Sequence, residues 1–200
     1  MKRLSFIVVS LLVVVFTGFG CAGQAYTQKG WITLIDGASG LENWDRVGPG
    51  NWRAEDGAIV VDRTLDKAYS YLVTKNAYSD FQIRVEFWVS HDANSGIFMR
   101  CSDVKKISDK TCYEANIFDE RKDPTFGTGA ITHISPVSPM PKAGGKWNVY
   151  EITVKGDRIT LVLNGVRTAD ARDSKFASGP IGLQYAAGVV KFRKFQIKPL

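Results

Sequence analysis

Residues 81–90 read FQIRVEFWVS, and the pattern in this stretch decides the fold class. Apolar and polar residues alternate along it with a period of two. The apolar side carries Phe81, Ile83, Val85, Phe87 and Val89. The other side carries Gln82, Arg84, Glu86 and Trp88. This alternation predicts a β-strand with one face buried in a core.

Shorter strand-like runs lie on both sides of this stretch, about ten residues apart, with turn signals between them. The turns are Asp56-Gly57, Gly156-Asp157 and Asn164-Gly165, and no segment shows a long helical period. We expect further strands at 52–55, 58–62, 97–101, 113–118, 150–155, 158–163, 181–185 and 189–197. The sequence therefore predicts one all-β domain over residues 31–200, a two-sheet antiparallel β-sandwich.

The composition is that of an ordinary globular protein. Of 200 residues, 44% are apolar and 23% are charged, and the formal net charge is +6. The basic residues are spread along the chain and do not interleave with aromatic residues as a nucleic-acid groove requires. We therefore expect no nucleic-acid partner.

The N-terminus resembles an export signal. Lys2 and Arg3 precede an apolar stretch that runs to about Phe19, and small residues follow it. This pattern predicts a signal peptide over residues 1–22, and hence a location in the periplasm or envelope. A retained membrane anchor is the less favoured alternative, because a stretch of roughly 16 residues is short for a ~30 Å hydrocarbon core.

The three cysteines suggest two uses. Cys21 lies where a bacterial lipoprotein carries its lipid, so we expect lipidation there and a membrane contact through that anchor. Cleavage after Ala22 or Ala25 would instead remove it. Cys101 and Cys112 lie close together in sequence and predict a disulfide in an oxidising compartment. A metal site is the alternative, but no histidine or further cysteine lies at ligand spacing beside them.

A series of local strings resembles one family in order and spacing. They include LIDG at 34–37, NSGIFMR at 94–100, YEANIFD at 113–119, TGAI at 128–131, LNG at 163–165 and GPIGLQ at 179–184. Together they resemble the 3-keto-disaccharide hydrolase domain family, from about Trp31 to Leu200. The family usually has Gln where this chain has Asn116, and an aromatic residue and Gly where it has Thr132 and His133.

The resemblance implies a concanavalin-like jelly roll that cleaves glycosides oxidised to a ketone at sugar carbon 3. Such a ketone acidifies the proton on carbon 2. Its removal lets the enolate expel the group on carbon 1, and water can then add. The reaction needs a general base, an electrophile for the oxyanion, and an acid for the leaving oxygen. A divalent metal ion is a candidate electrophile.

We expect Glu114 to be the general base or a metal ligand, since it lies on strand 113–118 and shares a face with Asn116. His133, in a Gly/Pro-rich loop, is the candidate general acid or metal ligand, and Asp119 is a third catalytic candidate. A solvent-facing Glu114 and a His133 without a catalytic role are the structural alternatives. If strict alternation holds, Asp119 faces the other way and caps a loop.

Arg100, Asn116 and Trp88 are the candidate substrate-binding residues. The Arg100 guanidinium could hold sugar hydroxyls or the enolate oxygen, or instead form an ion pair that supports the fold. Trp88 lies on the polar side of its strand and suits sugar stacking. Trp44 and Trp147 are expected to fill the core.

Three functions fit these residues. The first is an enzyme that cleaves 3-keto-glycosides, and the second is a non-catalytic carbohydrate-binding module on the same scaffold. A structural envelope lipoprotein is the third. Because fold alone does not separate them, the discriminating feature is whether Glu114, His133, Arg100 and Asp119 converge in a groove.

Overall fold

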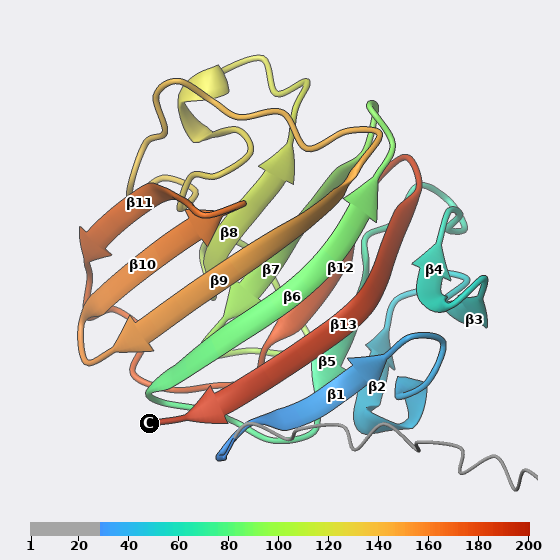
Figure 1. Cartoon of the computed structure of the whole chain (residues 1–200), viewed down its shortest axis with the longest axis horizontal. Coiled ribbons are helices and arrows are strands. Elements are labelled where there is room, and N and C mark those ends of the chain that lie inside the picture. Colours follow the sequence, from blue (N-terminus) through green and yellow to red (C-terminus); the bar gives the residue numbers. More distant parts are fainter. Residues whose placement is uncertain (1–28) are drawn as a thin grey trace, which may run out of the picture.

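The computed structural model describes residues 29–200, which form a sandwich of two antiparallel sheets (Figure 1). The predicted signal peptide and Cys21 lie outside the described residues, and both stay predictions. Within residues 29–200, no helix is long and apolar enough to cross a membrane.

The first layer is an eight-stranded sheet that forms the front of the molecule in Figure 1. Seven of its strands follow one another in a linear order, and β1 lies off this order and pairs with β13. In spatial order its strands are β11 (Val166–Arg172), β10 (Arg158–Leu163), β9 (Trp147–Lys155), β6 (Phe81–Val89), β13 (Val190–Pro199), β4 (Ala58–Val61) and β3 (Arg53–Glu55), with β1 (Ile32–Asp36) beside β13.

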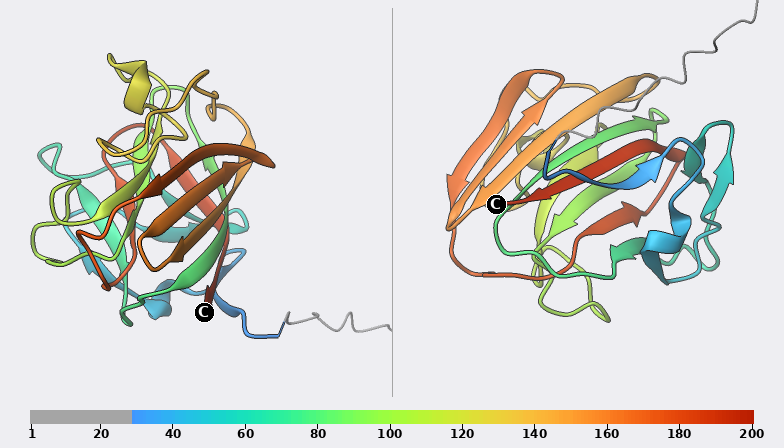
Figure 2. Two further views of the ribbon diagram at one scale, coloured as in Figure 1. Left: turned by 90° about the vertical axis from the view of Figure 1, so that its left-hand side faces the viewer. Right: turned by 60° about the horizontal axis from the view of Figure 1, so that its bottom comes forward.

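The second layer is a five-stranded sheet packed behind the first, as the two views of Figure 2 show. Its strands, in spatial order, are β2 (Trp44–Val47), β5 (Ser70–Thr74), β12 (Gly182–Tyr185), β7 (Asn94–Met99) and β8 (Tyr113–Phe118). Two short 3-10 turns, η1 (Leu41–Asn43) and η2 (Pro124–Phe126), complete the regular structure. The prediction of a two-sheet all-β sandwich is confirmed.

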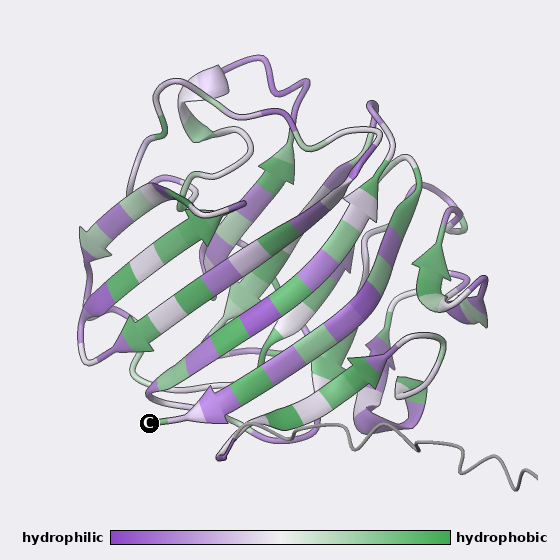
Figure 3. Ribbon diagram, in the orientation of Figure 1, coloured by the Kyte–Doolittle hydropathy of each residue, from purple (hydrophilic) through white to green (hydrophobic). Residues whose placement is uncertain are grey.

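Strand β6 lies in the middle of the large sheet, between β9 and β13. Its odd-numbered residues from Phe81 to Val89 are buried, and its even-numbered residues are half-buried or exposed. The same alternation colours β9 and β13 in stripes in Figure 3. The buried side packs against the second sheet, and Trp44 fills this core as predicted, edge-on to Phe195 at 5.0 Å between ring centroids.

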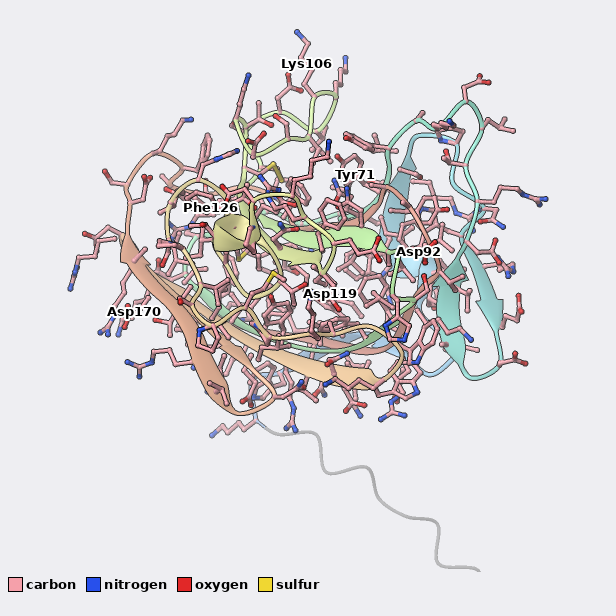
Figure 4. All side chains as sticks on the ribbon, turned by 90° about the horizontal axis from the view of Figure 1, so that it is seen from above. Tyr71, Asp92, Lys106, Asp119, Phe126 and Asp170 are labelled. Atoms are coloured by element: carbon pink, nitrogen blue, oxygen red, sulfur yellow. A yellow bond between two sulfur atoms is a disulfide. The ribbon has the colours of Figure 1, made fainter. Side chains whose placement is uncertain are left out.

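The outer face of the five-stranded sheet carries a second, smaller core. Cys101 and Cys112 form the predicted disulfide, which closes residues 102–111 into a loop, the disulfide loop. Its Ile107 packs with Tyr71 and Phe98 from the sheet and with the two cysteines. In Figure 4, Lys106 of this loop lies beyond Tyr71, on the side away from the orange strands of the large sheet. The loop therefore covers part of a sheet face that would otherwise meet solvent.

Candidate functional site

A cavity of about 200 Å³ lies on the outer face of the five-stranded sheet, beside the disulfide loop. Four adjacent strands provide its floor, and two loops provide its walls. The second wall comes from residues 119–146, the long loop. Its lining includes Tyr71, Gln184, Phe98 and Glu114 from the strands, Asp109 from the disulfide loop, and Arg121, Thr132 and His133 from the long loop.

Strand alternation and register bring the floor residues together. Leu72, Leu183, Ile97 and Ala115 point into the core between the sheets, so their sequence neighbours point outward. Tyr71 pairs with Gln184 across β5 and β12, and Phe98 pairs with Glu114 across β7 and β8. The face that Glu114 shares with Asn116, as the 113–118 alternation predicted, is the face on which the cavity lies.

Gly96 makes room for the Glu114 carboxyl. A Cβ at position 96 would lie 2.8 Å from Glu114 Oε1, closer than real Cβ atoms approach other heavy atoms, and 3.1 Å from its Cγ, a tight contact. Gly96 is paired with Asn116 on β8, one row along the face from Glu114. The Glu114 side chain therefore extends from β8 over Gly96 of the neighbouring strand β7.

The Glu114 side chain is almost fully buried, with 9% of the residue exposed. This burial raises the pKa of its carboxyl to about 7, because an ion loses hydration there. The nearby Thr132 hydroxyl opposes the rise in pKa by favouring the ionised form. The negative charge of Asp109 adds to the rise, and the positive charge of Arg121 lowers the pKa. The carboxyl thus exchanges its proton near neutral pH, as a general base requires.

Tyr71 and Gln184 form a polar pair on the floor. The Tyr71 hydroxyl donates to the carbonyl oxygen of Ile107 at 3.2 Å, and Gln184 Nε2 donates to Tyr71 Oη at 3.4 Å. Burial raises the pKa of Tyr71 to about 12, so the phenol stays neutral. Gln184 Oε1 is buried without a hydrogen-bonding partner in the described structure. Buried acceptors are rarely left unpaired, so this oxygen is a candidate contact for a bound hydroxyl.

His133 and Asp109 join the two walls at the cavity rim. His133 Nε2 lies 3.1 Å from Asp109 Oδ2, and the histidine side chain is 59% exposed. The ring lies 5.4 Å from that of Phe126 between centroids, and the backbone at His133 has a φ of 61°. The structure therefore brings His133 to the same cavity as Glu114, but to its solvent-facing edge.

Asp119 is not at the cavity. Its buried carboxylate accepts from the Thr128 hydroxyl at 2.6 Å and from the backbone N–H groups of Ala143 and Gly144 at 2.9 and 2.8 Å. These donors come from two separate stretches of the long loop and occupy the carboxylate. We therefore correct the catalytic assignment: Asp119 fastens the loop that carries His133.

Asn116 shares the face of Glu114, as predicted, but lies beneath the long loop. Its side-chain Nδ2 donates to the carbonyl oxygen of Phe126 at 2.6 Å, and the residue is fully buried. It does not line the cavity. Its place in the fold is therefore to hold the loop, rather than to contact a ligand.

Arg100 points away from the cavity. Strand β7 ends at Met99, and the backbone at Arg100 has a φ of 51°, which breaks the alternation. The buried guanidinium donates to the carbonyl oxygens of Ser79, Gly156 and Phe176 at 2.7, 2.8 and 3.1 Å, and it pairs with Asp80 at 3.0 Å. Arg100 therefore ties three chain segments together, and the predicted substrate contact is replaced by this fold-supporting role.

Trp88 lies on the other sheet. It is on the outward face of β6, and the core separates it from the cavity. Trp147 is its register partner on β9 and is 37% exposed, so the expectation that Trp147 fills the core was wrong. Of the residues selected from the sequence, the structure therefore gathers only Glu114 and His133. Sequence reasoning missed Tyr71, Gln184, Asp109 and Arg121.

Metal ligands do not gather in the described structure. Within residues 29–200, no three His, Cys, Asp or Glu side chains lie close enough together to hold a metal ion. The divalent cation considered as an electrophile therefore has no ligand set in this part of the chain.

A domain family described as the 3-keto-alpha-glucoside-1,2-lyase-like domain matches residues 30–198 of this sequence. The chain belongs to this family. The family resemblance read from the local strings is thereby confirmed. No curated protein sequence matches this chain.

Solved structures share the fold of the lyase-like domain. A candidate glycosyl hydrolase from Parabacteroides distasonis superposes with a TM-score of 0.70 at 22% identity, covering 85% of this chain and 99% of that one. The carbohydrate-binding module CBM66 from Bacillus subtilis gives 0.59 at 18%, covering 84% and 93%. A Bacillus licheniformis β-glucanase gives 0.59 at 13%, covering 86% and 98%. The jelly-roll prediction is confirmed.

We expect Glu114→Gln to stabilise the lyase-like domain above neutral pH. The pKa of Glu114 is about 7 in the folded state and about 4.3 in an unfolded chain. Between these values the folded state binds more protons, so the free energy of unfolding falls as pH rises from about 4 to 7. Glutamine removes this loss, which is about 3–4 kcal/mol.

Urea unfolding at pH 4, 6 and 8 measures this effect. The two proteins should be equally stable at pH 4, and the variant more stable at pH 8. Glu151→Gln, at an exposed position on β9, is the control and should leave the pH dependence unchanged. Equal stabilities of wild type and Glu114→Gln at pH 8 would show that burial does not raise the pKa of the Glu114 carboxyl.

Proposed function

We propose that this protein cleaves glycosides carrying a ketone at sugar carbon 3, by elimination across carbons 1 and 2 with Glu114 as the general base. The observation that carries the proposal is a buried carboxyl, with a pKa of about 7, in a cavity lined by polar and aromatic side chains. The membership of the family supports the substrate class.

The Glu114 carboxylate takes the proton from carbon 2, and the C–H electron pair forms the enolate of the ketone. The enolate then re-forms the ketone and expels the oxygen on carbon 1, which leaves a double bond between carbons 1 and 2. Arg121 is the permanently charged cation among the lining residues, and we assign it to the enolate oxygen. It takes the role that the sequence suggested for Arg100.

The leaving oxygen needs a proton, and we assign this step to His133. Its position at the rim suits a leaving group that extends out of the cavity, and Asp109 Oδ2 lies 3.1 Å from its Nε2 and orients the ring. Later addition of water to the unsaturated product would make the overall reaction a hydrolysis.

The size of the cavity supports one bound sugar ring. At about 200 Å³ it is smaller than the roughly 300–1,000 Å³ of pockets for drug-sized ligands. The oxidised sugar would therefore enter, and the second sugar would remain at the rim.

Incubation of the protein with 3-keto-trehalose, with and without added divalent metal, tests the proposal. We expect release of free glucose and absorbance from an unsaturated ketone. In D₂O, we expect deuterium exchange at carbon 2 whenever the base acts but the leaving group does not depart. Sugar binding without product or exchange in either condition would overturn the enzyme proposal in favour of a binding module.

We expect Gly96→Ala to lower kcat/KM for this substrate by about 10–100-fold, because the added methyl displaces the Glu114 carboxyl from its place over the sheet. Gly182→Ala on β12 is the matched control. A Cβ there meets only ordinary contacts, the nearest being Phe98 Cβ at 3.4 Å, so activity should be kept. Equal activities of the two variants would contradict the assigned position of the base.

A further inference from the structure

A second cavity, of about 330 Å³, lies between the long loop and the hairpin of β10 and β11. In Figure 1 this hairpin is at the left-hand edge of the eight-stranded sheet, and the long loop lies above it. Residues 137–142 and Lys146 of the loop form one wall, and residues 163–164 and 166–168 of the hairpin form the other. We call this space the hairpin cavity. It shares no lining residue with the Glu114 cavity.

The charged side chains that line the hairpin cavity are all basic. They are Lys142, Lys146 and Arg167, and no Asp or Glu of residues 29–200 is part of the lining. The Lys142 ammonium donates to the backbone carbonyl oxygen of Asp119 at 2.6 Å, a neutral acceptor that leaves the positive charge uncompensated. Three cations without a carboxylate among them favour a negatively charged ligand.

Arg167 is free to turn toward such a ligand. Its guanidinium lies 3.4 Å from Asp170, and its side chain is 63% exposed. Asp170 is held more closely by Arg158, at 2.7 Å, so Arg167 is the weaker of its two partners. An exposed ion pair of this kind contributes little free energy, and a bound anion can replace it at small cost.

The rest of the lining offers apolar contact and one unused hydroxyl. The apolar residues are Val137, Pro139, Met140, Pro141, Leu163 and Val166. Val166, at the tip of the hairpin, is 65% exposed, so an apolar ligand group would cover it. Thr168 Oγ1 is buried and has no hydrogen-bonding partner in the described structure. Buried hydroxyls are rarely left unpaired, so this one is a candidate donor to a bound anion.

We propose that the hairpin cavity binds a small aromatic anion, such as an aromatic carboxylate. The planar guanidinium of Arg167 can both pair with a carboxylate and stack on an aromatic face. The Met140 thioether is a favourable neighbour for an aromatic ring, and Thr168 and the two lysines supply further donors to the charge. The volume lies within the roughly 300–1,000 Å³ of small-molecule pockets and limits the ligand to one small molecule.

Titration calorimetry with 2-naphthoate tests the proposal. Two further probes separate its two requirements, since 2-naphthamide keeps the rings without the charge and inorganic phosphate keeps a charge without the rings. We expect 2-naphthoate to bind about tenfold or more tightly than either of them.

Variants of the hairpin locate the binding site. Arg167→Met and Thr168→Val should each weaken 2-naphthoate binding about tenfold, because each removes a donor to the carboxylate. Thr168→Val removes an unpaired buried hydroxyl at almost constant volume, so it should bind less without losing stability in urea. Arg172→Met is the matched control. Arg172 lies on the same strand, is 69% exposed and does not line the cavity, so binding should be unchanged.

Glu114→Gln keeps this test apart from the enzyme proposal and should bind 2-naphthoate as the wild type does, whether or not the protein cleaves 3-keto-glycosides. Equal binding of 2-naphthamide would show that the cavity selects only for apolar rings, and equal binding of phosphate would show that it selects only for charge. Either result would overturn the proposal. So would the absence of 2-naphthoate binding, binding unchanged by both Arg167→Met and Thr168→Val, or binding lost in Glu114→Gln.

Discussion

Glu114→Gln is expected to lower kcat/KM for a 3-keto-glucoside by about 10²- to 10⁴-fold, the usual contribution of a positioned general base. The amide keeps the size of the side chain and its place over Gly96, but it cannot accept the proton from carbon 2. Deuterium exchange at carbon 2 should be lost together with cleavage, because both reactions start with the same proton transfer.

The pH profile of the wild type gives an independent measure of the same group. Because the pKa of Glu114 is about 7, kcat/KM should rise with pH up to about that value as the carboxylate becomes the main form. Steady-state rates between pH 5 and 9 measure this limb. Glu151→Gln should leave the profile unchanged, since that side chain is exposed on the other sheet. A Glu114→Gln variant that keeps cleavage and exchange would contradict the assignment of the base.

The loss of activity is expected together with a gain in stability at pH 8. A carboxylate buried at 9% exposure costs folding free energy, and the fold keeps it ionisable with only a partial offset from Thr132 and Arg121. Such opposite effects of one substitution are typical of groups placed for chemistry rather than for stability. Substitution of a residue that merely supported the fold would lower both the activity and the stability of the protein.

The strands with one buried face could be predicted from the sequence. The alternation in 81–90 placed β6, and that in 113–118 placed Glu114 and Asn116 on one face of their strand. The disulfide followed from the spacing of its cysteines. In each case the information is local, because the period of two or a short loop carries it.

The missing parts of the site depend on contacts between distant segments. Strand β5 is buried on both faces, since the disulfide loop covers its outer side, so residues 70–74 show no alternation that would point to Tyr71. Gln184 meets Tyr71 only through the pairing of strands 113 residues apart. Asp109 comes to His133 only when the two loops fold over the sheet. No local pattern carries these juxtapositions.

Arg100→Met is expected to lower the free energy of unfolding by about 3–5 kcal/mol. Arg100 is 2% exposed and lies at the edge of the sandwich, where its guanidinium serves the carbonyl oxygens of Ser79, Gly156 and Phe176. Methionine fills part of the volume but donates to none of them, and Asp80 also loses its partner. The cost therefore comes from acceptors left unpaired, rather than from lost apolar contact.

Urea unfolding measures this loss, and Arg158→Met is the matched control. Arg158 pairs with Asp170 at 2.7 Å, but its side chain is 52% exposed, so its replacement should cost less than about 1 kcal/mol. At low temperature, where the Arg100→Met protein is still folded, its KM for a 3-keto-glucoside should stay within about twofold of the wild type. A KM raised tenfold or more with unfolding unchanged would return Arg100 to the substrate-binding role that its place after β7 suggested. The distinction rests on the φ of 51° at this residue, which directs the side chain to the sandwich edge and leaves Arg121 as the guanidinium at the cavity.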